Sequence, residues 1–116
     1  MTDPFFTLLV NGKLSASAER GKKVFEETEC IECHAPPLFS STELHDLHLG
    51  TGMDKDKPFT VPTLIEVWRT APYLHDGRAA TIRDVLTTFN VGDSHGTTSS
   101  LTEQELNDLI EYVLSL

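Results

Sequence analysis

The sequence predicts an all-α domain of three to four helices joined by long loops. Apolar residues recur with the helical period in three segments, and these segments begin with residues that cap helices. No two segments alternate apolar and polar residues as paired strands do. The 116 residues fit one domain, and 39% hydrophobic residues is an ordinary value for a globular chain. We therefore expect an N-terminal extension over residues 1–15 and a single domain over residues 16–116.

The first predicted helix covers residues 16–29. Ser15 or Ser17 can cap its N-terminus, and Glu19 places a negative charge where the helix dipole favours one. Gly21 lies on the apolar stripe of this helix. Because a glycine there costs roughly 1 kcal/mol of helix propensity, we expect Gly21 to serve the close approach of another helix.

Two shorter helices are predicted in the middle of the chain. One begins at Thr81, with Asp84 completing a variant of the capping box, and carries Phe89 on its apolar face. The other begins with a proline and covers residues 62–69, before Pro72 stops it.

The last helix has the strongest start signal. Thr102 and Glu105 form a capping box. The acidic residues of this helix, Asp108 among them, are expected on the polar side. The opposite, apolar side is formed by Leu106, Leu109, Ile110, Val113 and Leu114.

Segments 35–61 and 91–100 are rich in Gly, Pro, Ser, Thr and Asp and are expected to be loops. The first is long for a structureless connection, and such loops often cover a ligand.

Charge and hydropathy exclude some classes of partner. Lys and Arg number 9 against 18 Asp and Glu, which gives a net charge of −9 and argues against nucleic acid. No apolar run approaches the roughly 18–20 residues of a membrane span. The N-terminus lacks the basic start and the cleavage site of a signal peptide.

Both cysteines fall in the pentapeptide Cys30-Ile-Glu-Cys33-His34, the attachment sequence of c-type haem. Two thiols one helical turn apart can form thioethers to the two vinyl groups, and the adjacent imidazole then faces the iron. We therefore expect one covalent haem c with His34 as its proximal ligand. Covalent attachment takes place outside the cytoplasm, so we expect a periplasmic or other extracytoplasmic location.

Two other uses of this cysteine pair fit the sequence less well. A zinc site ordinarily needs four ligands, and the sequence has no second cysteine pair. A thioredoxin-like dithiol needs a βαβ setting, which the helical pattern does not supply.

Two sets of residues carry a resemblance to known families. Gly21-Lys-Lys-Val-Phe, the haem attachment motif and Tyr112 resemble a class I cytochrome c, whose first and last helices cross at a glycine and an aromatic residue. Three further segments resemble the C-terminal haem domain of the bacterial di-haem cytochrome c peroxidase and MauG superfamily. They are the attachment motif with the Ala-Pro-Pro that follows it, residues 61–64, and Trp-Arg-Thr-Ala-Pro-Tyr-Leu-His-Asp-Gly-Arg-Ala-Ala-Thr over residues 68–81.

This resemblance implies a class I cytochrome c-like fold around one covalently bound haem. Enzymes of the superfamily carry two haems on two such domains, whereas this chain has one attachment motif. The resemblance therefore implies either half of an oxidoreductase, with a second haem domain in the parent protein, or a single-haem relative.

The resemblance also locates a departure at the distal ligand. The superfamily places a Met or a Tyr at the end of the helix after the His-Asp-Gly motif, and this chain has Phe89 there. Phenylalanine cannot bind iron and is expected to be a core residue. For the sixth position we rank His95 first, Met53 second and a vacant or water-occupied site third. The other histidines are expected to shape the haem surroundings (His75) or to be solvated in a polar loop (His45 and His48).

The walls of the haem pocket are expected to be apolar. Arg69 and Arg78 are candidates to pair with the haem propionates, because a guanidinium meets a carboxylate with two hydrogen bonds; the alternative for each is an ordinary surface arginine. The four candidates for a dry wall are Phe25, Leu64, Trp68 and Phe89.

These expectations favour electron transfer, with the iron cycling between Fe(III) and Fe(II). Acids next to the attachment motif form either a solvated face or a docking patch for a basic redox partner; they are Glu26, Glu27, Glu29 and Glu32. The alternative functions are an electron-relay or haem domain of a peroxidase-type enzyme, or a single-haem protein that binds a small ligand or reacts with peroxide.

Overall fold

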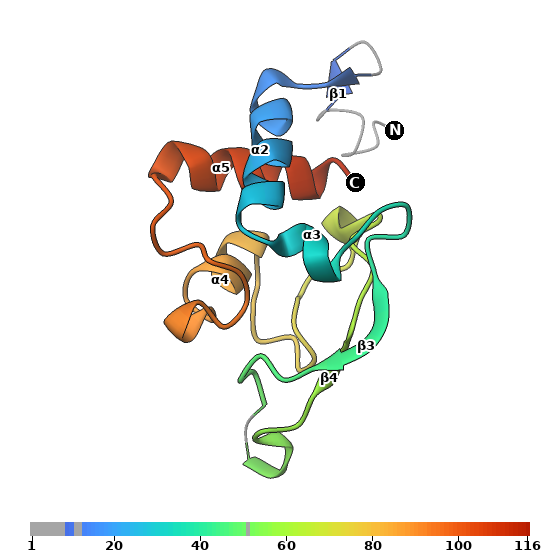
Figure 1. Ribbon diagram of the computed structural model, residues 1–116, viewed down its shortest axis with the longest axis vertical. Coiled ribbons are helices and arrows are strands. Elements are labelled where there is room, and N and C mark those ends of the chain that lie inside the picture. The colour runs from blue at the N-terminus through green and yellow to red at the C-terminus, as the bar shows by residue number, and fades with distance from the viewer. Residues whose placement is uncertain (1–8, 11–12, 51) are drawn as a thin grey trace.

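The computed structural model describes residues 9–10, 13–50 and 52–116. Within these residues lie four helices and two small antiparallel sheets (Figure 1). The elements in chain order are β1 (Leu9–Val10), β2 (Lys13–Leu14), α2 (Ala16–Glu27), α3 (Cys30–Cys33), β3 (Ser41–His45), β4 (Phe59–Val61), α4 (Ile82–Leu86) and α5 (Glu103–Leu114). Most of the expected extension over residues 1–15 lies outside the described residues, and its described part is the β1–β2 hairpin. No helix among the described residues is long and apolar enough to cross a membrane.

Helix α2 starts at the predicted cap and stops two residues early. The Ser15 hydroxyl accepts a hydrogen bond from the Ala18 N–H at 3.1 Å. At the other end, the Thr28 hydroxyl donates to the Val24 carbonyl, and Glu29 adopts a left-handed φ of 68°. This residue turns the chain from α2 into the short helix α3.

Helices α2 and α5 cross at Gly21, as the sequence predicted (Figure 1). A Cβ atom built on Gly21 would lie 2.5 Å from the Asp108 carbonyl carbon, closer still to its oxygen, and 2.9 Å from the Tyr112 Cβ. Next to this crossing, the rings of Phe25 and Tyr112 pack edge to face with centroids 5.3 Å apart. The main core therefore lies where the two longest helices cross.

The capping box at the start of α5 is confirmed, because Thr102 and Glu105 each bond the other's backbone N–H. The expectation that Asp108 lies on the polar side was wrong, since this side chain is buried. Its carboxylate accepts hydrogen bonds from Arg20 at 2.9 Å and Ser17 at 2.7 Å. The Arg20 guanidinium holds the pKa of Asp108 below its usual value and keeps it ionised.

The middle helices are shorter than predicted. Thr81 caps α4 through the Asp84 N–H, but the helix ends at Leu86, so Phe89 lies beyond it. Segment 62–69 contains only a 3₁₀ turn at Val67–Arg69. The Thr63 hydroxyl bonds the nearby Ile65 N–H, and a side-chain bond of this kind competes with helical bonding.

The expectation of no paired strands was wrong for segment 35–61. Strands β3 and β4 pair antiparallel, with Leu44 opposite Thr60 and His45 opposite Phe59. An irregular register between Ser41 and Leu44 removes the regular alternation that identifies strands in a sequence. The pair lies below α3, on the side of the molecule away from the crossing of α2 and α5 (Figure 1).

Candidate functional site

A cavity of about 630 Å³ lies between α3, the β3–β4 pair and the loops that follow β4 and α4. Cofactor sites commonly measure about 300–1,000 Å³. The predicted attachment residues Cys30, Cys33 and His34 all line it, and so do the predicted wall residues Phe25 and Leu64. The fold therefore brings the attachment motif to the wall of a cofactor-sized space.

Helix α3 is a single turn that presents both cysteines to the cavity. Both are free thiols, and the Cys30 sulfur lies 3.3 Å from the Thr28 hydroxyl. Burial raises the pKa of the Cys30 and Cys33 thiols. Both cysteines are therefore protonated thiols in the protein without a bound group.

His34 is oriented by the loop that follows it. Its Nδ1 lies 3.1 Å from the Phe39 carbonyl oxygen, which can only accept, so Nδ1 carries the proton. This leaves Nε2 with a lone pair for a metal, the usual state of a ligating histidine with a second hydrogen-bond partner. Burial lowers the pKa of His34 and favours the neutral ring.

His95 also lines the cavity and lies close to His34. The two rings have centroids 6.5 Å apart and planes inclined by 34°. Nδ1 of His95 is buried and has no hydrogen-bond partner among the described residues. Burial, followed by the influence of His34, lowers the pKa of His95 to about 4. Two buried imidazoles whose neutral forms are favoured thus lie close together in the cavity lining.

The loop that carries His95 is held by Asn90, a buried residue for which the sequence analysis assigned no role. Its side-chain oxygen accepts the His95 N–H at 2.7 Å, and its amide donates to the Gly96 carbonyl at 2.9 Å and to the Thr98 hydroxyl at 2.7 Å. An asparagine before a Gly-rich loop was its one signal in the sequence.

His45 also lines the cavity, whereas its polar sequence context predicted a solvated side chain. Its Nε2 lies 3.8 Å from the Cys33 sulfur and 3.7 Å from a carboxylate oxygen of Glu43. Strand β3, which was not predicted, brings it there.

Neither arginine proposed for the propionates lines the cavity. Arg69 is exposed and pairs with Glu66 at 2.6 Å. Arg78 pairs with Asp76 at 3.1 Å and donates to the Leu49 carbonyl. Among the described lining residues there is no Lys or Arg, and Glu29, Glu32 and Asp93 are the acids.

Two of the predicted aromatic wall residues also lie outside the cavity lining. Phe89 follows α4, and the Arg78 guanidinium lies over its ring, with Cζ 5.7 Å from the ring centroid. Trp68 is half-buried in the 3₁₀ turn, and its indole nitrogen is buried with no partner among the described residues.

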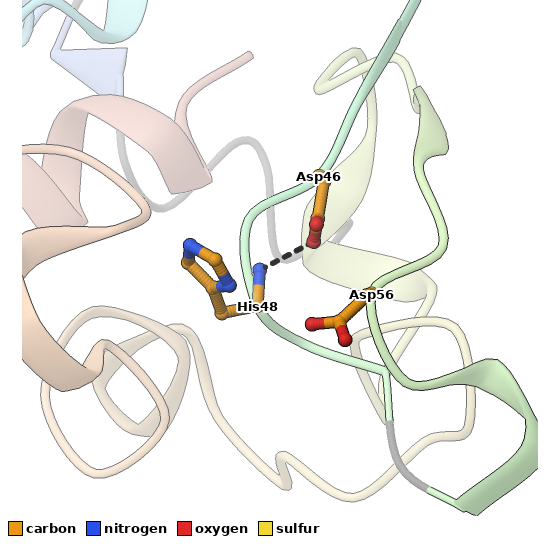
Figure 2. Close-up of side chains that lie close together, drawn as sticks. All are labelled: Asp46, His48 and Asp56. Atoms are coloured by element: carbon orange, nitrogen blue, oxygen red, sulfur yellow. Dashed lines mark hydrogen bonds between the residues drawn. The ribbon is translucent and has the colours of Figure 1, made fainter.

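Met53, the second candidate for the distal ligand, is 93% exposed. His48 is exposed too and does not line the cavity. Figure 2 shows it in the same loop region with Asp46 and Asp56, and one ligand atom from each of the three lies within 4.8 Å of the others. Because all three side chains are exposed to water, we assign them no part in the cavity's chemistry.

The residues present fit a haem c. Covalent attachment requires two cysteines one turn apart, and the cavity lining has them. Iron ligation requires imidazoles, and the lining offers the oriented ring of His34 and the ring of His95, whose buried Nδ1 has no partner among the described residues. Apolar residues also line the cavity.

Comparison with known proteins agrees with this donor set. The sequence model of the cytochrome c family matches residues 18–116. The chain is 46% identical over 66 residues to hydrazine synthase subunit gamma of Kuenenia stuttgartiensis, covering 56% of this chain and 19% of that protein. It is 25% identical over 124 residues to the methylamine utilization protein MauG of Methylorubrum extorquens, and the match covers 89% of this chain and 35% of that protein. With cytochrome c551 peroxidase of Nitrosomonas europaea the identity is 32% over 85 residues, covering 60% and 25%.

Solved structures share the fold. A chain of K. stuttgartiensis hydrazine synthase superposes with a TM-score of 0.81 and 30% identity, over 92% of this chain and 48% of that one. A MauG-like protein associated with microbial copper homeostasis gives a TM-score of 0.60 at 23% identity, over 91% and 48%. This chain therefore spans about half of these structures and 19–35% of the three curated relatives above. The chain belongs to the cytochrome c family, which implies a covalently bound haem c, and it is related to MauG and to the cytochrome c peroxidases.

Proposed function

We propose that this domain transfers electrons through one haem c that Cys30 and Cys33 would bind covalently and whose iron His34 and His95 would ligate. The close pair of imidazoles in the cavity lining carries the proposal. Two metal–imidazole bonds of about 2.0–2.1 Å, with about 1 Å from each nitrogen to its ring centre, span about 6 Å. The observed separation of 6.5 Å between ring centroids leaves room for one metal ion.

The bound group supplies an iron that cycles between Fe(III) and Fe(II). The protein's part is to hold and orient it. The Phe39 carbonyl fixes the His34 ring, and Asn90 fixes the loop of His95. Phe25 and Leu64 contribute apolar surface to the cavity wall.

Filling both axial positions favours electron transfer over binding of a small molecule. An iron with two protein ligands has no open position for peroxide or a gas, whereas an iron with one does. Because haem c is attached outside the cytoplasm, we also propose a periplasmic or other extracytoplasmic location for the domain.

Absorption spectra of the haem-loaded protein test this function. We expect low-spin, six-coordinate iron in both oxidation states, and no change when carbon monoxide is added to the reduced protein. A high-spin oxidised spectrum that shifts with carbon monoxide or cyanide would contradict electron transfer through a closed site. That result would favour the small-ligand or peroxidatic alternative.

A second candidate function is that of an electron-relay domain within a longer oxidoreductase. The observation that favours it is that the chain spans 19–35% of relatives named as a hydrazine synthase subunit, MauG and a peroxidase. A second C-x-x-C-H motif encoded in the same reading frame would support this candidate over an independent carrier.

The partner is expected to be basic. The chain carries a net charge of −9, and Glu29 and Glu32 lie at the cavity lining with no Lys or Arg among the described lining residues. Electron transfer with a cationic redox protein should slow as ionic strength rises from about 0.01 M to 0.15 M, where the Debye length falls from roughly 30 to 8 Å.

Stopped-flow rates over this range measure the effect. Glu32→Gln should weaken the salt dependence more than Glu103→Gln, which removes the same charge at the start of α5, where Glu103 pairs with Arg83. Rates independent of salt would contradict the electrostatic docking.

A further inference from the structure

The connection between β3 and β4 brings one histidine and two aspartates together outside the cavity. Asp46 and His48 follow the end of β3, and Asp56 precedes β4. One ligand atom from each of these three side chains lies within 4.8 Å of the other two (Figure 2). All three side chains are exposed, and none of the three lines the cavity. The two ends of the connection therefore meet at a cluster of one imidazole and two carboxylates.

The backbone places this cluster on the outer side of the cavity wall. Over residues 45–49, the odd-numbered positions line the cavity and the even-numbered positions, Asp46 and His48, are exposed. Extended backbone produces such an alternation, because successive side chains point to opposite faces. The cluster thus belongs to a segment whose other side forms the cavity wall.

Two local features orient the side chains of the cluster. The His48 N–H donates to a carboxylate oxygen of Asp46 at 2.9 Å, which fixes this carboxylate and leaves its second oxygen for a cation. His48 and Asp56 adopt left-handed φ values of 59° and 63°, a conformation in which His and Asp are enriched among residues other than glycine. The ligand atoms are therefore brought close together by the chain itself.

From this donor set we infer that Asp46, His48 and Asp56 bind one Zn²⁺ or a similar divalent transition metal, which ties the two ends of the β3–β4 connection together. An imidazole nitrogen with carboxylate oxygens suits such metals, whereas Ca²⁺ and Mg²⁺ take oxygen ligands. The inference is independent of the proposed electron transfer, because no residue of the cluster lines the cavity.

The distances fit a single ion. Zinc bonds to nitrogen and oxygen of about 2.0–2.2 Å place two ligand atoms of one ion at most about 4.4 Å apart. The ligand atoms of the cluster lie within 4.8 Å of one another, so small rotations of three exposed side chains bring them onto one ion. Water can complete the coordination, since the cluster is open to solvent.

Charge also favours a cation at this place. The carboxylates of Asp46 and Asp56 repel each other at this separation, in a chain whose net charge is −9. A divalent cation between them replaces this repulsion with attraction to both. It also closes the chain between residues 46 and 56, and a metal that closes a loop restricts the loop's conformations. We therefore expect a bound ion to restrain this part of the cavity wall.

Isothermal titration calorimetry of the haem-loaded protein with zinc chloride tests the site. The haem-loaded form is used because its cysteines are thioethers and leave no thiol to compete for zinc. We expect one Zn²⁺ per chain, bound more tightly than Ca²⁺. His48→Gln and Asp56→Asn should each weaken the affinity more than about tenfold, since the loss of even an outer-shell partner of a metal typically costs 10–100-fold.

Glu43→Gln is the matched control. It removes the same charge as Asp56→Asn, from a β3 side chain that is 79% exposed and lies outside the cluster, and it should keep the affinity for zinc. The haem absorption spectra of all three variants should equal that of the unmodified protein, which shows that each variant is folded.

Trypsin cleavage after Lys55, an exposed residue next to Asp56, reports opening of the connection. Zinc should slow this cleavage in the unmodified protein and in Glu43→Gln, but not in His48→Gln. Three results would overturn the site: no zinc binding, equal zinc affinity in His48→Gln and Asp56→Asn, or tighter binding of Ca²⁺ than of Zn²⁺. None of these results bears on the haem or on electron transfer, which the absorption spectra test separately.

Discussion

Replacing His95 with alanine is expected to convert the oxidised haem-loaded protein from low-spin to high-spin iron. The imidazole that lies 6.5 Å from the His34 ring, centroid to centroid, would be lost, and alanine has no donor atom to replace it. The open position should then bind carbon monoxide in the reduced state and cyanide in the oxidised state. Absorption spectra before and after adding each ligand measure the change.

Met53→Ala is the matched control, because it removes the other candidate ligand from a site that is 93% exposed. Its spectra should equal those of the unmodified protein. An unchanged low-spin spectrum in His95→Ala would eliminate His95, and a high-spin spectrum in Met53→Ala would show that the loop around Met53 reaches the iron.

Gly21→Ala is expected to destabilise the fold strongly. An alanine Cβ would lie 2.5 Å from the Asp108 carbonyl carbon and 2.9 Å from the Tyr112 Cβ, so α2 and α5 must move apart. Overpacking of this kind costs about 1–3 kcal/mol or more. Intrinsic helix propensity has the opposite sign, since alanine is favoured over glycine by roughly 1 kcal/mol inside a helix. If the denaturant midpoint of Gly21→Ala is lower than that of the unmodified protein, the loss of stability therefore comes from the helix crossing and not from helix propensity.

Lys22→Ala, at the next position of α2 but exposed, is the control for propensity and should leave the midpoint nearly unchanged. If Gly21→Ala were as stable as the unmodified protein or more so, the two helices would not cross at Gly21.

Local signals made part of this structure predictable. The caps at Ser15 and Thr102 depend on residues three positions apart, and both are present. The approach of α5 to Gly21 was also predictable, because a glycine on an apolar helical stripe has few other uses. His34 was placed by a motif whose spacing already specifies its chemistry.

The remaining features depend on contacts distant in sequence. Asp108 is buried because Arg20 and Ser17, 88 and 91 residues away, satisfy its carboxylate, and no periodicity reveals such partners. Strand β3 lacks regular alternation, so the position of His45 against Cys33 was hidden as well. Phe89 lies outside the helix predicted for it because α4 ends after Leu86.

The mass of the denatured protein, expressed in a host that attaches haem c, tests the central claim most directly. Two thioethers form by addition of the thiols of Cys30 and Cys33 across vinyl groups, so the account predicts the polypeptide mass plus one whole haem. The doubly substituted Cys30→Ala, Cys33→Ala chain should show the polypeptide mass alone. A bare polypeptide mass for the unmodified chain would contradict covalent attachment and, with it, the proposed electron carrier.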